Sequence, residues 1–107
     1  MSKDKVLFVQ LKGRQKFLRL FGDSSKLQGL RSGYVVLKPQ ASIGEHNTGS
    51  SEEVIIVTEG RGLISCGSFK VLKVKKHSFV YVPPHTPHNV INTGRVALKY
   101  VYTAARA

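Results

Sequence analysis

Two short segments of the sequence carry side chains whose types and spacing could support chemistry. The first contains His46 and then the adjacent glutamates Glu52 and Glu53, and the second contains His85 and His88. Two neutral imidazoles and one carboxylate form a competent donor set for Fe(II), Mn, Ni, Zn or Co when they converge on one point. Spacing along the chain does not show convergence, so the residues alone leave an ordinary turn or core role open for each histidine.

The two adjacent glutamates cannot both face the interior that the histidines face. Side chains of a strand alternate between its faces, so Glu52 and Glu53 point in opposite directions, whereas His46 and Thr48 share one face. Glu53 immediately precedes the apolar run Val54–Val57, and a carboxylate facing a core is costly unless it is paired or metal-bound. We therefore predict Glu53 as the inward carboxylate and Glu52 as the solvated one, an assignment that a one-residue error would reverse.

Short strands must position these side chains, because helical periodicity is nearly absent and apolar runs recur between turn-forming residues. The predicted strands are Val6–Leu11, Phe17–Phe21, Tyr34–Lys38, Val54–Thr58, Gly62–Cys66, Phe69–Val74, Phe79–Val82 and Leu98–Tyr102. Gly60 and Gly62 favour a hairpin turn between two of these runs, since glycine accepts positive φ. This number and spacing of strands predicts an all-β fold, a single antiparallel β-barrel or jelly roll.

Length and composition limit the class of protein. The 107 residues have room for one domain, and 41% hydrophobic residues supply one core. No run approaches the roughly 18 apolar residues of a membrane span. No signal peptide is visible. The single cysteine, Cys66, excludes an internal disulfide and any multi-cysteine zinc site within one chain. We expect a single domain that is not inserted in a membrane and that resides in the cytoplasm.

The charge balance brings acidic partners into consideration. The chain has 17 Lys and Arg against 6 Asp and Glu, a net charge of +11, which suits nucleic acid, phosphorylated small molecules or anionic headgroups. Nucleic-acid binding needs a recognition helix or a basic face with interleaved aromatic residues, for which Phe17 and Phe21 are weak evidence, so nucleic acid is the weakest of these. A small anionic ligand is the preferred expectation.

The two histidine segments resemble the motifs of the cupin superfamily, a group of small β-barrels. The first motif runs Gly, five residues, His-x-His, three or four residues, Glu, six residues, Gly. The second runs Gly, five residues, Pro-x-Gly, two residues, His, three residues, Asn. The matching positions are His46, Glu53 and Gly60 in the first motif and Pro83, His88 and Asn92 in the second. The resemblance covers about residues 33–102 and implies one cupin domain over 1–107, with 1–32 as extra N-terminal strands.

The sequence also departs from these motifs. Thr48 replaces the second histidine of the first motif, and Gln40 replaces its leading glycine. His77 and His85 stand where the second motif usually has glycine. We interpret both as turn residues, His77 on the surface, with a role as ligand or acid–base group as the alternative for His85. The metal ligands that the resemblance still implies are His46, Glu53 and His88. Thr48 is left to supply a weak hydroxyl ligand or to hold a water.

Other residues are assigned structural roles. Asn92 is expected to satisfy backbone groups near the site, and Cys66 to pack as a small apolar residue. The four tyrosines are strand residues for which packing is the default. One of them can line the cavity, but the sequence does not choose which.

The resemblance implies a class of function rather than one reaction. The first hypothesis is a metal-dependent enzyme of the isomerase or dioxygenase type, acting on a small anionic substrate such as a sugar phosphate or a carboxylate. Stand-alone barrels similar to mannose-6-phosphate isomerase suggest phosphosugar chemistry. The alternative is a non-catalytic module that binds a small ligand without metal, which the loss of a ligand at Thr48 favours. Small cupins usually pair, so the resemblance also implies a homodimer.

Overall fold

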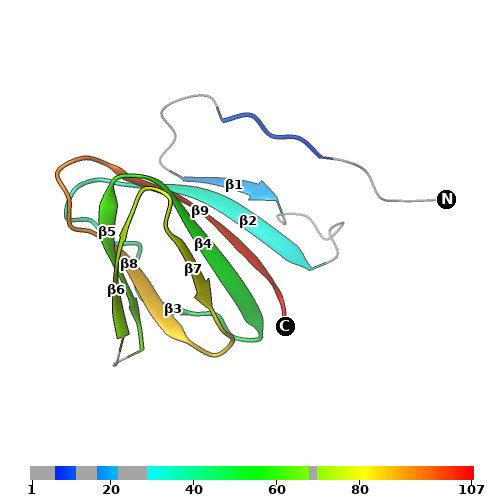
Figure 1. Ribbon diagram of the computed structural model, residues 1–107. Helices are drawn as coiled ribbons and strands as arrows, with labels where there is room; N and C mark the ends of the chain where they lie inside the picture. The colour runs from blue at the N-terminus through cyan, green and yellow to red at the C-terminus, as the bar shows by residue number, and fades with distance from the viewer. Residues whose placement is uncertain (1–6, 12–16, 22–28, 68–69) are drawn as a thin grey trace.

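The protein folds as an all-β domain (Figure 1). This computed structural model describes residues 7–11, 17–21, 29–67 and 70–107. Within those ranges the elements are β1 (Phe17–Phe21), β2 (Leu30–Leu37), β3 (His46–Asn47), β4 (Ser51–Glu59), β5 (Arg61–Cys66), β6 (Lys70–Lys75), β7 (Phe79–Val82), β8 (Pro87–Asn92) and β9 (Leu98–Arg106). Among the described residues there is no helix that could cross a membrane.

The strands form two antiparallel sheets. One sheet has the order β1-β2-β9-β4-β7 and the other the order β3-β8-β5-β6, and the two lie as layers in Figure 1. Within the described ranges no ladder joins them, so the jelly roll that the sequence predicts is present as two facing sheets rather than one closed barrel. The alternation of half-buried and buried residues along β8 shows that this strand turns one face inward.

The core fills the space between the two layers. The first sheet contributes Ile55, Val57 and Leu98, and the second contributes Ile64 and Val90, all of them at most 1% exposed. Burying one such side chain stabilises the fold by about 1.5–3 kcal/mol. Toward one end of the layers the inward positions change from apolar to polar residues, and this is where the histidine segments lie.

The predicted N-terminal strand over Val6–Leu11 is wrong for its described part. Residues 7–11 pair with no strand among the described residues, and Val6 lies outside them. The segment is apolar but exposed, with Phe8 81% accessible. An apolar run favours a strand only when a neighbouring backbone supplies hydrogen bonds, and no strand of the described residues does so here. β1 does form as predicted and pairs with β2.

The turn predictions are confirmed where the structure describes them. Gly60 joins β4 to β5 with a φ of 81°, and His77 and His85 adopt positive φ values of 76° and 57°. The strand predicted over Phe69–Val74 is observed as β6, and Phe69 itself lies outside the described residues. The sequence expectation missed β3 and β8, the two strands that carry the histidines.

Candidate metal centre

Three potential ligands from both layers converge at one end of the fold. His46 on β3 is the direct register partner of His88 on β8, and their ring centroids are 4.1 Å apart. Glu53 comes from β4 in the facing sheet. One donor atom from each of the three residues lies within 4.8 Å of the other two. A separation of this size is compatible with binding one cation between them.

The two adjacent glutamates point in opposite directions, as predicted. Glu53 is only 8% exposed and lines the cavity. Glu52 faces the other side of the sheet, where its Oε1 accepts a 2.7 Å hydrogen bond from the Tyr81 hydroxyl. The alternation of strand β4 therefore selects Glu53 as the inward carboxylate.

His88 is held so that one ring nitrogen faces the other two ligands. The side chain is fully buried, and its Nδ1 lies 3.0 Å from the carbonyl oxygen of Thr86. Because a carbonyl only accepts, Nδ1 carries a proton and Nε2 is the nitrogen that faces Glu53, 3.5 Å from its Oε1. Nε2 is buried and has no hydrogen-bond partner, which costs about 1–3 kcal/mol if nothing binds there.

The charge on Glu53 changes the acidity of His88. Burial lowers the pKa of His88, but the Glu53 carboxylate and the Thr86 carbonyl together raise it by more, so the net shift is upward. Without a metal, the protonated ring, whose charge Glu53 stabilises, therefore forms at a higher pH than in an ordinary histidine. A divalent cation in the same place would provide the same positive charge and would also use the Nε2 lone pair.

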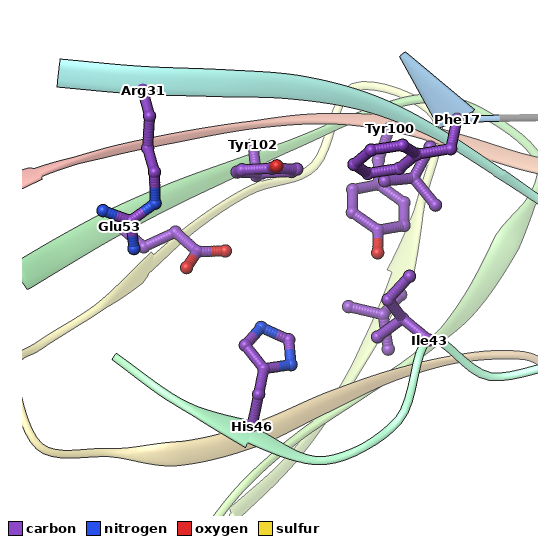
Figure 2. A pocket seen from close by; sticks show the side chains of 9 residues that line it. Phe17, Arg31, Ile43, His46, Glu53, Tyr100 and Tyr102 are labelled. Atoms are coloured by element: carbon purple, nitrogen blue, oxygen red, sulfur yellow. The ribbon is translucent and has the colours of Figure 1, made fainter. Parts of the chain in front are cut away.

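His46 is the solvent-exposed member of the three candidate metal-binding residues. Its Nδ1 lies 3.1 Å from the carbonyl oxygen of Gly44, so the same argument leaves Nε2 as the acceptor nitrogen. Figure 2 shows the ring pointing from β3 into the cavity toward Glu53. The residue is exposed, so a ligand can reach the group from this side.

A cavity of about 190 Å³ adjoins His46 and Glu53 of this group. It is lined by Phe17, Arg31, Val35, Ile43, His46, Glu53, Val90, Tyr100 and Tyr102, and Figure 2 shows both tyrosine rings beside it. Gly33 makes room for the ring of Tyr102, because a Cβ atom at that position would collide with it. The wall of the cavity is thus apolar except for His46, Glu53, Arg31 and the hydroxyls of the two tyrosines.

Sequence reasoning missed several of these lining residues. Tyr100 and Tyr102 alternate with outward residues on β9, so the strand prediction already placed them on one face, but nothing identified that face as the inner one. Arg31 lies on β2, which begins at Leu30, four residues before the predicted start at Tyr34. A strand start within a polar, glycine-containing stretch gives little signal.

The hydroxyl of Thr48 forms hydrogen bonds within the loop before β8. β3 ends at Asn47, so the expected alternation of His46 and Thr48 on one strand face does not hold. The buried Thr48 hydroxyl donates to the Pro83 carbonyl at 2.7 Å and accepts from the backbone N–H of Thr86 at 3.0 Å. These two bonds give the oxygen a structural role in the loop before β8, which the sequence did not predict.

The remaining histidines and Asn92 have structural roles. His85 is an exposed turn residue whose backbone N–H donates to the carbonyl of Gly49 at 2.8 Å. The Asn92 amide donates to the carbonyls of Leu37 and Val96, each at 2.9 Å. Asn92 therefore satisfies backbone groups as predicted, but at the opposite end of β8 from His88 and not beside the cavity.

The fold and the cavity define a class, a two-layer jelly roll with a histidine and carboxylate cluster between its sheets. Residues 33–103 match the family model of the cupin domain (Cupin_2). Because this match spans more than half of the chain, the protein belongs to the cupin family. The expectation from the two motifs is confirmed at this level.

Known proteins show how far the similarity extends. The uncharacterized protein MJ1618 of Methanocaldococcus jannaschii is 39% identical over 72 residues, which cover 67% of this chain and 55% of that protein. The chain therefore spans about half of this relative. The structure of BH2720 from Bacillus halodurans superposes with a TM-score of 0.78 and 25% identity, covering 90% of this chain and 74% of that one. The structure of a predicted oxalate decarboxylase from Thermotoga maritima superposes with a TM-score of 0.77 and 18% identity, covering 85% of this chain and 79% of that one. An identity this low shows the fold alone.

Proposed function

We propose that this cupin binds one divalent metal ion through His46, Glu53 and His88 and acts as a metal-dependent enzyme on a small anionic substrate. The buried Nε2 of His88, which has no hydrogen-bond partner and lies 3.5 Å from Oε1 of Glu53, is the observation that carries the proposal. A buried polar atom without a partner is rare in native proteins and calls for an explanation. A bound cation supplies one with the residues already in place.

The donor set narrows the metal to a group of ions. Two imidazole nitrogens and one carboxylate oxygen suit Fe(II), Mn, Ni, Zn or Co and leave coordination positions open. When bound, such an ion supplies Lewis acidity toward a substrate oxygen, or a centre for oxygen activation. This is the chemistry that isomerase-type and dioxygenase-type reactions require.

The protein groups around the ion have separate roles. Glu53 offsets the charge of the cation, and the carbonyls of Thr86 and Gly44 fix the rings of His88 and His46. Tyr100 lines the cavity, and burial, followed by the charge of Glu53 and by Tyr102, raises the pKa of its hydroxyl. The phenol keeps its proton and can donate a hydrogen bond to a ligand oxygen.

A second candidate is a non-catalytic module that binds a small ligand without metal. It is favoured by Thr48, which occupies the place of the second histidine of the first motif and whose hydroxyl is engaged elsewhere. Such a module would use the same cavity. The two candidates differ in whether the protein needs the cation at all.

The proposal is tested by elemental analysis of untagged protein after growth with supplemented metals. We expect about one metal ion per chain in wild type and a loss of it in His46→Ala and His88→Ala. His77→Asn is the matched control, because His77 is an exposed turn histidine and asparagine tolerates positive φ. A wild type that stays empty would refute the metalloenzyme and favour the metal-free module.

We also propose a homodimer, a cytoplasmic location and a single domain over residues 1–107. The homodimer is supported by an exposed apolar patch, defined as Val54 on β4 with Phe79 and Tyr81 on β7, which are 36%, 70% and 56% exposed. The cytoplasmic location is supported by the lone cysteine, Cys66, which is half-buried and free. The single domain is supported by β1, which joins the ladder of β2.

A further inference from the structure

Arg31 and Glu53 occupy matching positions on the inner face of the first sheet. Both are register partners of Ala104, Arg31 from β2 and Glu53 from β4, on opposite sides of the central strand β9. Directly paired residues project from the same face, and two strand spacings put their Cα atoms roughly 10 Å apart. Ala104 between them has only a methyl group, so the space between the two longer side chains stays open.

The guanidinium of Arg31 is available to a ligand in this space. Figure 2 shows the side chain reaching from β2 toward the cavity beside Glu53. Glu53 makes its ion-pair contact with His88, and no such contact joins it to Arg31, although the structure describes both residues. Arg31 is exposed, so its charge stays hydrated at the mouth until an anion displaces the water.

We infer that Arg31 binds the carboxylate of a short monocarboxylic acid. An oxygen at the other end of the same acid reaches the group formed by His46, Glu53 and His88. This inference rests on the proposed function and specifies its substrate class. The planar guanidinium presents paired N–H donors that match a carboxylate in a bidentate manner. The acid lies between Arg31 at the mouth of the cavity and the three candidate metal-binding residues.

The size and lining of the cavity favour a carboxylic acid over a sugar phosphate. Its volume of about 190 Å³ is below the roughly 300–1,000 Å³ of pockets that take drug-sized ligands. Val35, Ile43 and Val90 line it and offer no hydrogen bonds for the hydroxyl groups of a sugar. A short hydrocarbon body fits these side chains, with one polar group at each end.

The test compares a charged and a neutral probe that otherwise share one carbon skeleton, 3-hydroxybutyrate and 1,3-butanediol. Glycerol 3-phosphate is titrated beside them to represent the phosphate class of ligand. Binding is measured by NMR titration of the Zn²⁺-loaded and of the metal-free protein, for wild type, Arg31→Gln and Arg31→Lys. Arg95→Gln is the control, because Arg95 is an exposed arginine in the loop between β8 and β9, away from the residues that line the cavity. Zinc content is determined for every sample.

We expect wild type to prefer the carboxylate and Arg31→Gln to weaken its binding by roughly tenfold, as the loss of a charge-assisted hydrogen bond does. Arg31→Lys should keep part of the preference, and Arg95→Gln all of it, with zinc content unchanged. An unchanged preference in Arg31→Gln, no carboxylate binding by wild type, or tighter binding of glycerol 3-phosphate would overturn the inference. A wild type without zinc would instead refute the proposed function, and the metal-free titration would still test Arg31.

Discussion

At the scale of single residues, the site depends on which nitrogen of His88 is protonated. The Thr86 carbonyl holds a proton on Nδ1, and Nε2 is left facing Glu53 in a buried position. The motifs in the sequence were sufficient to predict the three candidate ligands by number. They could not predict this orientation, because it depends on a backbone carbonyl two residues away whose direction follows from the loop geometry.

Tyr100 gives a pH prediction at the same scale. Burial, with smaller contributions from Glu53 and Tyr102, raises the pKa of its hydroxyl above the ordinary value of 10.0. Above pH 10 the unfolded chain therefore binds fewer protons than the folded one, and the free energy of unfolding falls as pH rises. Urea unfolding between pH 8 and 11 should show this decline in wild type and a smaller one in Tyr100→Phe. Equal declines in the two proteins would contradict the buried, protonated phenol.

At the scale of elements, the short strand β3 and the strand β8 carry the site, and the sequence did not predict either. β3 has only two residues, too few for any periodicity, and β8 begins at Pro87, which suggests a turn rather than a strand. The strands β4 and β9 were predicted because each contains an apolar run that is visible in the sequence. Arg31 was missed for a related reason, since β2 begins before its apolar run does.

Thr48, just after β3, is hydrogen-bonded to the loop just before β8. Replacing its hydroxyl tests whether these bonds hold the two strands together. Thr48→Val keeps the shape of the side chain but leaves the Pro83 carbonyl and the Thr86 N–H without their partner. We expect the free energy of unfolding to fall by about 1–3 kcal/mol, measured by urea denaturation. The control is Thr58→Val, which removes one exposed hydrogen bond to the Lys99 carbonyl and should change stability much less. A Thr48→Val protein as stable as Thr58→Val would show that these bonds are unimportant.

At the scale of the whole molecule, a net charge of +11 opposes association between two copies. A homodimer must therefore bury a surface with few charges, and the exposed apolar patch of Val54, Phe79 and Tyr81 is such a surface. The sequence could not locate this patch, because its residues alternate with core residues on β4 and β7 and read as core until the inner face is known.

Replacing one residue of the patch should separate the copies. Phe79→Lys places a charge in the patch, whereas Val71→Lys adds the same charge on β6, at a residue of the other sheet that is 62% exposed. Size-exclusion chromatography with light scattering should give a dimer for wild type and Val71→Lys and a monomer for Phe79→Lys. A monomeric wild type, or a dimer in all three proteins, would remove this patch as the interface.

The pair of adjacent glutamates tests the central claim, a cation held between the two sheets, most directly. Glu53→Gln and Glu52→Gln remove the same charge from neighbouring positions that face opposite sides of β4. Calorimetric titration with Mn²⁺ should show one site in wild type, nearly unchanged affinity in Glu52→Gln, and a loss of roughly a hundredfold or more in Glu53→Gln, because ligands matter at least as much as the groups that orient them. Equal effects of the two substitutions, or no Mn²⁺ binding by wild type, would contradict a metal centre formed by His46, Glu53 and His88.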